Sequence, residues 1–553
     1  MEFVYDIRLN HVGFPTRAKK VFVLEGEAAE CFEVQRMVNG CLTPVLRATL
    51  TRDADGKLIG DFSSIVREGV YKIAVGDRLS RTFYVYDAVY DSVCRTMTQY
   101  FEWQRCGDDC GYNPNCHLGD KIVDKNGVIH PLAGGHHQSG DLRKWSFGCP
   151  AGIFGLSEYL DEFRPLWNKG RLEYEIEHSL KHYLNRISPD GYVFDSTFVP
   201  TYYDDAECRG KGYPTEVAFW DDFLYFDEPT DPHGHCLVIK MLASASRSLR
   251  QTNPARAKEA LQGAMRVWEY MHRVGQYETS HEWRIYPPIG HDTFKELLFD
   301  FYYPDSAIML ADLCSAEVEL YRAAPDEGLK EIILDRLKKL CSLEILTPDG
   351  AHDRFRLSTD STRFAEEVKY FPVSIPLTFA KAYDLFSEDP DAAFLLPRIE
   401  AFVKFYEKQA AGNAYGKTTT HLACENARLV WDYFGASYVF DHAETVLFLT
   451  VASRYVCREA CLTMAQRLLD YIVGANPQDI SCIEGVGFNQ LPFAVFGEFF
   501  PPLPKIPGAV ITDFDPEFET GIYGREYDMP IVGMLLLAFA RYQRECREPQ
   551  TSS

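Results

Sequence analysis

The feature that most constrains the fold is a change in hydrophobic periodicity near residue 90. After it, apolar residues recur at helical spacing, as with Leu261, Met265 and Trp268 in a stretch that begins at Asn253-Pro254, where proline suits a first helical position. About a dozen helices separated by long loops favour an (α/α) barrel of concentric helices. A solenoid, the other all-helical arrangement, would need a fixed-period repeat, and the sequence has none. The other expected helices cover residues 91–104, 152–163, 171–186, 235–250, 303–323, 328–342, 374–386, 394–409, 442–456, 459–473 and 528–544.

Before residue 90 the chain consists of short β-rich runs separated by turns such as Asn39-Gly40 and Asp55-Gly56. Regular short strands separated by such turns predict a β-sandwich of immunoglobulin-like size. We therefore expect two domains, a sandwich over residues 1–88 and a helical barrel over residues 89–546. The expected strands are Asp6–Leu9, Lys20–Leu24, Glu33–Met37, Lys57–Phe62, Val70–Val75 and Thr82–Tyr86.

Composition and charge exclude several classes of protein. The chain has 57 Lys+Arg against 80 Asp+Glu, a net charge of −23, and no basic cluster, which argues against nucleic acid and anionic membranes as partners. The apolar run from Ile531 to Ala540 is far shorter than the roughly 20 residues of a membrane span. The sequence also lacks a Walker loop, a strand-linked GxGxxG, a GxSxG elbow and an HExxH motif.

The N-terminus and the cysteines give an expectation about the cell compartment. The first residues include Glu2 and Asp6 and have no basic or apolar signal-peptide region. Sixteen cysteines are scattered from Cys31 to Cys546, and a chain of this size does not need disulfide bonds to support its core. We expect a reduced, cytoplasmic protein.

Two loop segments, QRCGDDCGYNPNCHLGD and GGHHQSGD, carry a possible metal site. Cys106, Cys116, His117 and His137 would supply two thiolates and two imidazoles, a complete tetrahedral zinc set with no position open for water. The region lacks apolar periodicity, so burial in a core explains these residues poorly. The alternative is a group of unrelated thiols and surface histidines. The competing ligands are Cys110 and His136.

Two groups of carboxylates are candidates for acid–base chemistry. Asp141 ends a glycine-rich loop and is either a rigidly held general base or a helix N-cap. The acidic segment from Asp513 to Asp528 alternates carboxylates with aromatic residues. Burial beside aromatic rings raises a carboxyl pKa and suits a general acid, whereas a solvated loop before a helix is the alternative.

Aromatic and polar side chains gather in the loops around residues 202–227. Tyr203 and Trp220 could stack on sugar rings, and the Asp222 carboxylate could bind sugar hydroxyls. Ordinary packing is the alternative for each of them. His235, in PTDPHGH, is either part of a polar site or a helix start.

Together these motifs resemble glycoside hydrolase family 9, the cellulase-type inverting enzymes, over nearly the whole chain. IRLNHVGFP, DFSSI, EGVYKIAVG and TFYVYD are similar to the domain that precedes the barrel in one branch of that family. YFEWQRCG…CH is similar to the start of the barrel, GGHHQSGD to GGWHDAGD, and YIVGANPQDISCIEGVGFNQ to G-x-NP…S-[YF]-x-x-G-x-G. The resemblance implies a multidomain α+β fold, in which an N-terminal immunoglobulin-like β-sandwich is followed by an (α/α)6 barrel.

The resemblance also implies roles for single residues. Asp141 matches the catalytic base, and Gln138 stands where the family has a second aspartate that helps to hold the nucleophilic water. The set of Cys106, Cys116-His117 and His137 matches a structural zinc site of this branch. Family members often carry calcium as well, which the resemblance implies as a possible second metal.

Two departures from the family pattern affect the expected substrate and mechanism. The family's His-His-Arg substrate motif is replaced by a segment that begins at Asn489, which we take as a substrate-binding candidate. No ungapped match exists for the catalytic glutamate, so Glu526 is our first choice, Glu519 the second and Asp528 the third.

We expect an exo-acting hydrolase that cleaves short β-linked oligosaccharides, with glucosaminidase- or glucosidase-like specificity. It would invert the anomeric centre, with a water molecule attacking between two carboxyl groups roughly 6.5–9.5 Å apart. The alternative is a carbohydrate-binding or sensing protein that kept the barrel and lost catalysis. A lyase on the same barrel would need another base, for which Tyr202, Tyr203 and His235 are the candidates.

Overall fold

The structure is a computed structural model, and it describes most of both expected domains. The described residues are 4–26, 29–109, 114–124, 126–140, 144–146, 148–194, 224–226, 229–230, 232–274, 307–356, 367–368, 374–418, 438–492, 505–512 and 527–547.

Two β-sheets pack face to face in the N-terminal domain. One sheet has the strand order β1-β3-β7-β6, and the other has the order β2-β10-β8-β4-β5, with β9 paired to β8. The strands are β1 (Ile7–Arg8), β2 (Gly13–Phe14), β3 (Val21–Leu24), β4 (Cys31–Val38), β5 (Cys41–Thr49), β6 (Thr51–Arg52), β7 (Leu58–Asp61), β8 (Gly69–Val75), β9 (Arg78–Leu79) and β10 (Phe83–Val85).

The sandwich core consists of aromatic and aliphatic side chains from the inner faces of both sheets. Phe14, Phe62 and Phe83 pack against one another with ring centroids 5.3–5.8 Å apart. All six strands expected from the sequence are present, and the fold expectation of a β-sandwich is confirmed. The short strands β2, β6 and β9 and the longer β5 were not predicted from the sequence; β5 pairs with β4 across Asn39-Gly40. Both turn residues have positive φ, as a two-residue hairpin turn requires.

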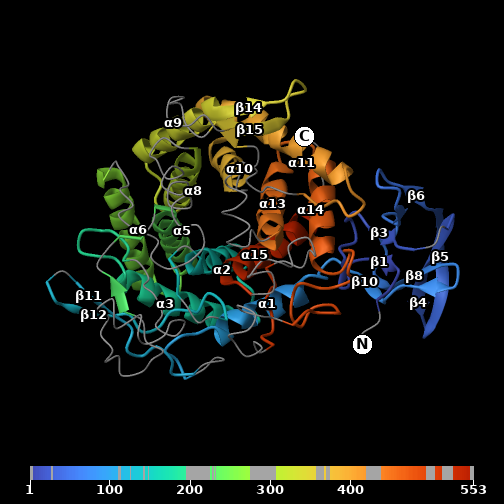
Figure 1. Ribbon diagram of the computed structural model, residues 1–553, viewed down its shortest axis with the longest axis horizontal. Helices are drawn as coiled ribbons and strands as arrows, with labels where there is room; N and C mark the ends of the chain where they lie inside the picture. Colours follow the sequence, from blue (N-terminus) through green and yellow to red (C-terminus); the bar gives the residue numbers. More distant parts are fainter. Residues whose placement is uncertain are drawn as a thin grey trace, which may run out of the picture.

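Twelve described helices form two concentric layers after residue 90 (Figure 1). The inner layer is a closed ring in the order α2-α5-α8-α10-α13-α15, and each inner helix packs on an outer one. The inner helices are α2 (Cys149–Phe163), α5 (Pro232–Ser248), α8 (Ala307–Ala323), α10 (Ser374–Phe386), α13 (Tyr438–Ala452) and α15 (Met529–Arg547). The outer helices are α1 (Asp91–Trp103), α3 (Lys169–Asn185), α6 (Pro254–Val274), α9 (Glu327–Leu343), α11 (Leu396–Ala411) and α14 (Arg458–Ile472).

The expected (α/α) barrel is thus confirmed, and the closed ring excludes a solenoid. The last strand of the sandwich ends at Val85 and α1 begins at Asp91, on either side of the boundary that we expected. Short elements lie between the helices: β11 (Lys121–Val123), β12 (Ile129–Pro131), β13 (Leu224–Phe226), β14 (Glu344–Leu346), β15 (His352–Arg356), β16 (Glu367–Val368) and a 3-10 helix, η2 (Pro390–Leu395).

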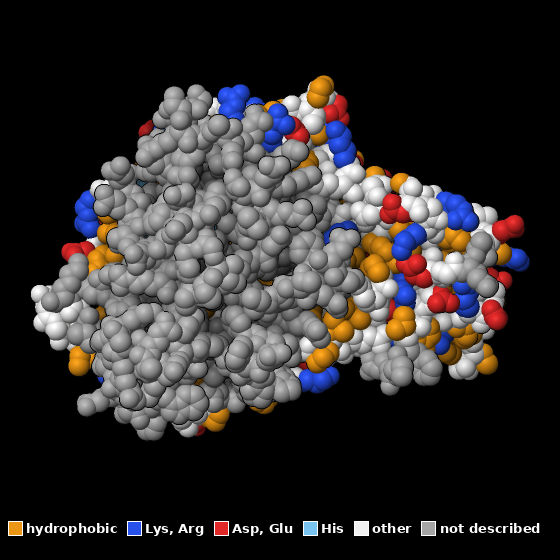
Figure 2. All heavy atoms as spheres, in the orientation of Figure 1, with side chains coloured by type: hydrophobic (Ala, Val, Ile, Leu, Met, Phe, Trp, Pro, Cys, Tyr) orange, Lys and Arg blue, Asp and Glu red, His pale blue; other side chains and the backbone are white. Residues whose placement is uncertain are grey.

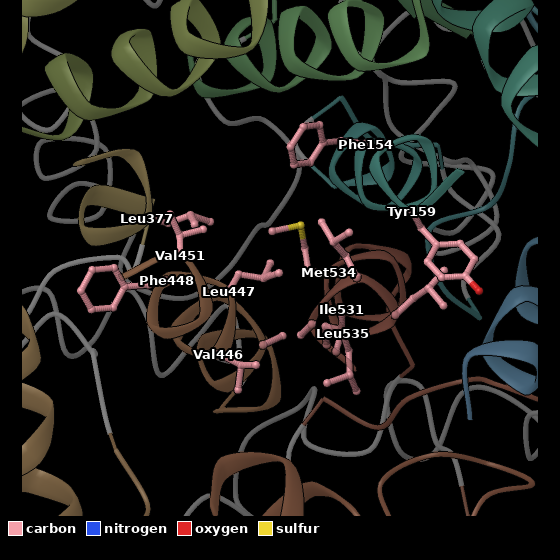
Figure 3. Packing of buried hydrophobic residues seen from close by; sticks show 14 of the residues in the cluster. Phe154, Tyr159, Leu377, Val446, Leu447, Phe448, Val451, Ile531, Met534 and Leu535 are labelled. Atoms are coloured by element: carbon pink, nitrogen blue, oxygen red, sulfur yellow. The ribbon is translucent and has the colours of Figure 1, made fainter. Parts of the chain in front are cut away.

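Hydrophobicity explains which helices lie inside. Every described residue of α15 from Met529 to Gln543 is buried, whereas α6 buries residues three or four apart on a single face. Figure 3 shows how side chains of α2, α10, α13 and α15 meet in the core, among them Phe154, Leu377, Leu447 and Met534. No helix among the described residues is long and apolar enough to cross a membrane.

The ring closes where α2 meets α15, the first and last inner helices. There the backbones touch at glycines: a Cβ on Gly533 would lie 2.2 Å from the carbonyl oxygen of Gly152, and one on Gly155 would lie 2.3 Å from Gly533. Any side chain at these positions would separate the two helices, so glycine is required for this close approach.

The sandwich is fixed to the barrel through a buried histidine. The His11 backbone N–H donates to the Val473 carbonyl (2.8 Å), and the His11 ring accepts the Phe488 N–H at Nδ1 (3.2 Å). Nε2 is therefore the donor to Asp479 Oδ1, at 2.9 Å. Burial lowers the pKa of His11 and outweighs the opposing effect of Asp479, which favours a neutral ring. Arg81 supplies the charge partner of Asp479 at 3.0 Å.

On the face seen in Figure 2, Lys, Arg, Asp and Glu side chains of the sandwich domain are interspersed and do not gather into a basic patch.

The glycine contact between α2 and α15 can be tested with one methyl group. We expect Gly533→Ala to lower the free energy of unfolding by about 1–3 kcal/mol, because the new Cβ overlaps the backbone of Gly152. Gly170→Ala is the matched control: Gly170 lies in α3, a Cβ there meets nothing within 4 Å, and alanine should stabilise by about 0.5–1 kcal/mol. Chemical denaturation of both variants measures the difference, and equal stability would contradict the proposed contact.

Candidate metal centre and active-site region

Two loop segments are joined by backbone hydrogen bonds just after α1. The Cys106 N–H donates to the Gly135 carbonyl (2.9 Å), and the His137 N–H donates to the Gln104 carbonyl (2.8 Å). These bonds place the two sequence motifs that carry the expected ligands next to each other, although about 30 residues separate them in the chain.

The four expected ligands, Cys106, Cys116, His117 and His137, form one buried cluster. One donor atom from each lies within 4.8 Å of all the others, and each residue is at most 3% exposed. His137 Nε2 is 3.3 Å from Cys116 Sγ and 3.4 Å from His117 Nδ1. Bond lengths of about 2.0–2.3 Å to a tetrahedral metal require donor separations of about 3.3–3.8 Å. The donor set therefore fits a four-coordinate metal ion.

Backbone strain accompanies this arrangement. Asn115 and His117 have φ values of +57° and +54°, in the left-handed region that residues other than glycine rarely adopt. Such conformations persist where the surroundings hold them, as ligation of a metal by two adjacent residues would do.

A buried ion pair supports the cluster. Lys144 Nζ lies 2.6 Å from Asp120 Oδ2, and both side chains are fully buried. The same ammonium donates to Cys106 Sγ (3.1 Å) and to the Gly134 carbonyl (3.1 Å). Burial raises the pKa of the Cys106 thiol and lowers that of the His137 imidazole. The sequence does not predict this ion pair, because neither residue belongs to a periodic pattern or a ligand spacing.

His136, which we considered as a competing ligand, is engaged elsewhere. Its Nε2 lies 3.0 Å from Glu175 Oε2 and its Nδ1 lies 2.7 Å from Ser179 Oγ. Arg105 donates to the same Glu175 carboxylate through its Nε. His136 therefore belongs to a buried ion cluster next to the metal centre and not to the ligand set. Cys110, the other competing ligand, lies outside the described residues.

Gln138 lies where the N-terminal ends of two inner helices meet. Its backbone carbonyl accepts the N–H of Met529, the first residue of α15 (2.8 Å), and the hydroxyl of Tyr100 (3.0 Å). Its side-chain amide lies against the backbone of Gly148, where a Cβ would overlap it. Gln138 is thus held at the start of both α2 and α15.

The structure gives contacts for two further candidates. His235 is 2% exposed, accepts the Val193 N–H at Nε2 (3.1 Å) and stacks on Tyr270 with a centroid distance of 5.4 Å. Asn489 donates to the carbonyl (2.8 Å) and carboxylate (3.2 Å) of Asp479, in the contact between the domains. Both side chains make structural contacts, and their role in substrate binding stays a prediction.

The remaining candidates lie outside the described residues: Asp141, Glu519, Glu526, Tyr203, Trp220 and Asp222, with Tyr202. Asp528, the third choice for the acid, is described and directly precedes α15.

A β-sandwich joined to an (α/α)6 barrel, with a Cys2His2 cluster beside the N-terminal ends of the inner helices, defines the class of this protein. Residues 90–492 match the family described as Glycosyl hydrolase family 9. The chain belongs to this family, as its motifs led us to expect.

Two curated relatives match parts of the chain. Endoglucanase D of Acetivibrio thermocellus is 27% identical over 300 residues, which cover 49% of this chain and 46% of that enzyme. The cellodextrinase of Butyrivibrio fibrisolvens is 28% identical over 150 residues, covering 25% and 27%. The matched regions thus span about half or less of these relatives.

A solved structure, "Bacteroides ovatus GH9", superposes with a TM-score of 0.68 at 16% identity. The match covers 98% of this chain and 99% of that one. At this identity the likeness shows the shared two-domain fold alone.

The metal cluster predicts a measurable metal content. We expect wild-type protein to hold about one equivalent of tightly bound divalent metal and Cys116→Ser to hold almost none, because three donors remain. Loss of a ligand present at about 1,000 times its Kd costs about 4 kcal/mol of stability. Elemental analysis and thermal unfolding measure both effects. Cys461→Ser, buried in α14 away from the cluster, should retain the metal. Equal metal content in Cys116→Ser and wild type would rule the cluster out.

Proposed function

We propose that this chain is an inverting glycoside hydrolase that acts on short β-linked oligosaccharides from one end, with glucosidase- or glucosaminidase-like specificity. Membership of glycosyl hydrolase family 9 supports the reaction class. The match to a cellodextrinase supports a short substrate. The absence of the family's His-His-Arg motif, with Asn489 held instead by Asp479, favours a specificity other than that of ordinary endoglucanases.

The observation that carries this proposal is the hydrogen bond between Gln138 and Met529. These residues are three positions from Asp141 and three positions from Glu526, respectively. In an inverting enzyme a base and an acid must face each other across the scissile bond, with their carboxyl groups roughly 6.5–9.5 Å apart. A bond that joins the two chain segments at this point supports Asp141 and Glu526 as that pair.

In the proposed mechanism Asp141 removes a proton from water as it attacks the anomeric carbon, and Glu526 protonates the leaving oxygen. Gln138 replaces a family carboxylate near the base. A neutral amide can orient water by hydrogen bonding but adds no negative charge to raise the basicity of its neighbour. This substitution is the observation that favours the second candidate function, a sugar-binding protein without turnover.

We propose zinc as the metal of the Cys2His2 cluster. Two thiolates and two imidazoles are the donors that zinc prefers, and four protein ligands leave no position for a reacting water. A bound zinc ion would therefore contribute structure, by joining the segments around Cys106 and His137 beside the expected base. Calcium stays a proposal taken from the family resemblance alone: among the described residues, the Cys2His2 cluster is the one group of three or more His, Cys, Asp or Glu side chains placed to hold a metal ion.

We also propose a reducing, cytoplasmic location. No disulfide bond joins the cysteines that the structure describes. The metal cluster needs Cys106 and Cys116 as thiolates, which a reducing compartment preserves.

The role of Asp141 can be tested on a panel of gluco-, glucosamine and N-acetylglucosamine β-linked oligosaccharides. We expect wild type to release single sugars from one class, and Asp141→Asn to lose about 10²–10⁴-fold in kcat, because a general base contributes that much. Asp335→Asn, on the exposed surface of α9, is the matched control and should keep full activity. Ligand-induced thermal stabilisation without turnover by the wild type would favour the binding protein instead.

The acid can be identified by the leaving group. Glu526→Gln should slow natural oligosaccharides by about 10²–10⁴-fold but spare aryl glycosides whose leaving group needs no protonation. Glu519→Gln should affect both substrates equally or not at all. The reverse pattern would assign the acid to Glu519, and kcat measured on both substrate types distinguishes the two.

A further inference from the structure

The interior of the barrel contains a dense group of charged side chains that the proposed reaction does not use. Five inner helices contribute them, and most lie in the C-terminal halves of those helices, away from Gln138 and the start of α15. We name this group the interior ion cluster, and its members are Glu158 (α2), Arg247 (α5), Glu319 and Arg322 (α8), Lys381 (α10) and Arg541 (α15).

Two carboxylates form ion pairs with four cations in this cluster. Glu158 is fully buried and pairs with Arg247, with Arg322 (2.5 Å) and with Arg541 (3.3 Å). Glu319, also fully buried, pairs with Arg247 (3.2 Å), Arg322 (2.6 Å) and Lys381 (2.5 Å). The cluster therefore has two more positive than negative groups.

Neighbouring charges do not remove this excess. The rim adds two carboxylates, Asp161 and Glu162, but also two cations, Arg164 and Arg544. Among the described residues, no other carboxylate forms an ion pair with a member of the interior ion cluster. The cations therefore exceed the carboxylates by two when Lys381 is protonated and by one when it is neutral.

Lys240 and Glu444, in the earlier turns of α5 and α13, do not change the balance either. Both are buried. Burial raises the pKa of Glu444 to about 7, although the Lys240 ammonium opposes the rise. Because they are one cation and one carboxyl, they contribute no spare negative charge to the cluster.

Arg541 shows where a counter-charge is missing. Its Nε and Nη2 donate to the carboxylates of Glu162 and Glu158. Its Nη1 is buried and has no hydrogen-bond partner among the described residues, and the residue as a whole is 5% exposed. A buried guanidinium nitrogen without an acceptor is costly, because its bond to water is lost and not replaced.

The pKa of Lys381 reflects the same excess of positive charge. Burial above all, together with Arg541 and Arg322, lowers the pKa of its ammonium to about 7, although the Glu319 carboxylate opposes the shift. The ammonium also lies 4.8 Å from the centre of the Phe154 ring, whose π-electron face is its other partner. The arrangement is that of a site prepared for an acceptor that carries negative charge.

We propose that the interior ion cluster binds one small monovalent anion of halide size at Arg541 Nη1. An anion there would accept the unpaired N–H group and compensate one positive charge inside the ring of inner helices. A monatomic ion needs less room beside the buried carboxylates Glu158 and Glu319 than an oxyanion with several oxygens would. The site would stabilise the barrel and is separate from the residues proposed for catalysis.

The test uses intact protein purified throughout in bromide, in chloride or in methanesulfonate, at equal sodium concentration and pH. We expect Tm in both halides to exceed Tm in methanesulfonate by roughly 2–4 °C, with a dependence on halide concentration that saturates. Crystals grown in bromide should show an anomalous-scattering peak within about 3.5 Å of Arg541 Nη1.

Two variants separate the site from general salt effects. Arg541→Gln should lose the halide-dependent rise in Tm. Arg544→Gln, in the same helix and also paired with Glu162 but 31% exposed, should keep it. If Arg541→Gln does not fold, the wild-type protein and its bromide crystals still decide the matter. Equal Tm in all three salts, or no peak at Arg541, would overturn the proposal.

Discussion

The backbone contact between α2 and α15 is the constraint on which the rest of the barrel depends. These helices are the first and last of the inner ring, and more than 360 residues of chain separate Phe163 from Met529. Their closure at Gly152 and Gly533 fixes the ring as a whole and sets how close the chain segments before each helix can lie. The bond from Met529 to Gln138 follows directly from that closure. The expected base precedes one of these helices and the expected acid precedes the other. The distance between these two groups therefore depends on the glycine contact that holds the helices together.

The sandwich domain supports the barrel at a different place. His11 occupies space that side chains at Gly474 and Gly487 would fill. It binds the segment from Val473 to Phe488 through Val473, Asp479 and Phe488. This segment leads to Asn489, where the family's substrate motif is replaced. A neutral histidine that accepts one hydrogen bond and donates another fixes orientation without the desolvation cost of a second buried charge. The N-terminal domain therefore contributes to the shape of the barrel loops, although it contains none of the residues proposed for catalysis.

The sequence alone predicted the elements whose signal is local and repeated. Helical periodicity predicted the twelve helices that the structure describes, and short apolar runs separated by turns predicted six strands of the sandwich. Both patterns report directly on which side of an element is buried. The four metal ligands were predictable because ligand chemistry restricts residue type. His136 could not be excluded as a ligand in the same way. Its partners Glu175 and Ser179 lie on a helix about 40 residues away, and only the folded chain brings them together. The Lys144–Asp120 pair and β5 were missed for related reasons, since neither has a periodic pattern.

The charge distribution shows why net charge is a poor guide to local electrostatics here. The chain as a whole carries a formal charge of −23, which on its own favours cationic ligands. Inside the ring of helices the balance is reversed, because the buried Glu158 and Glu319 face four cations, of which Arg247 and Arg541 are almost fully buried. Charges on the surface interact weakly at physiological salt. A charge in the interior is costly unless it is paired or neutralised by loss of a proton, and otherwise the residue that carries it is replaced during evolution. Arg541 cannot lose its proton. The preference of this barrel for an anion is therefore determined by a few buried side chains and not by the acidic surface.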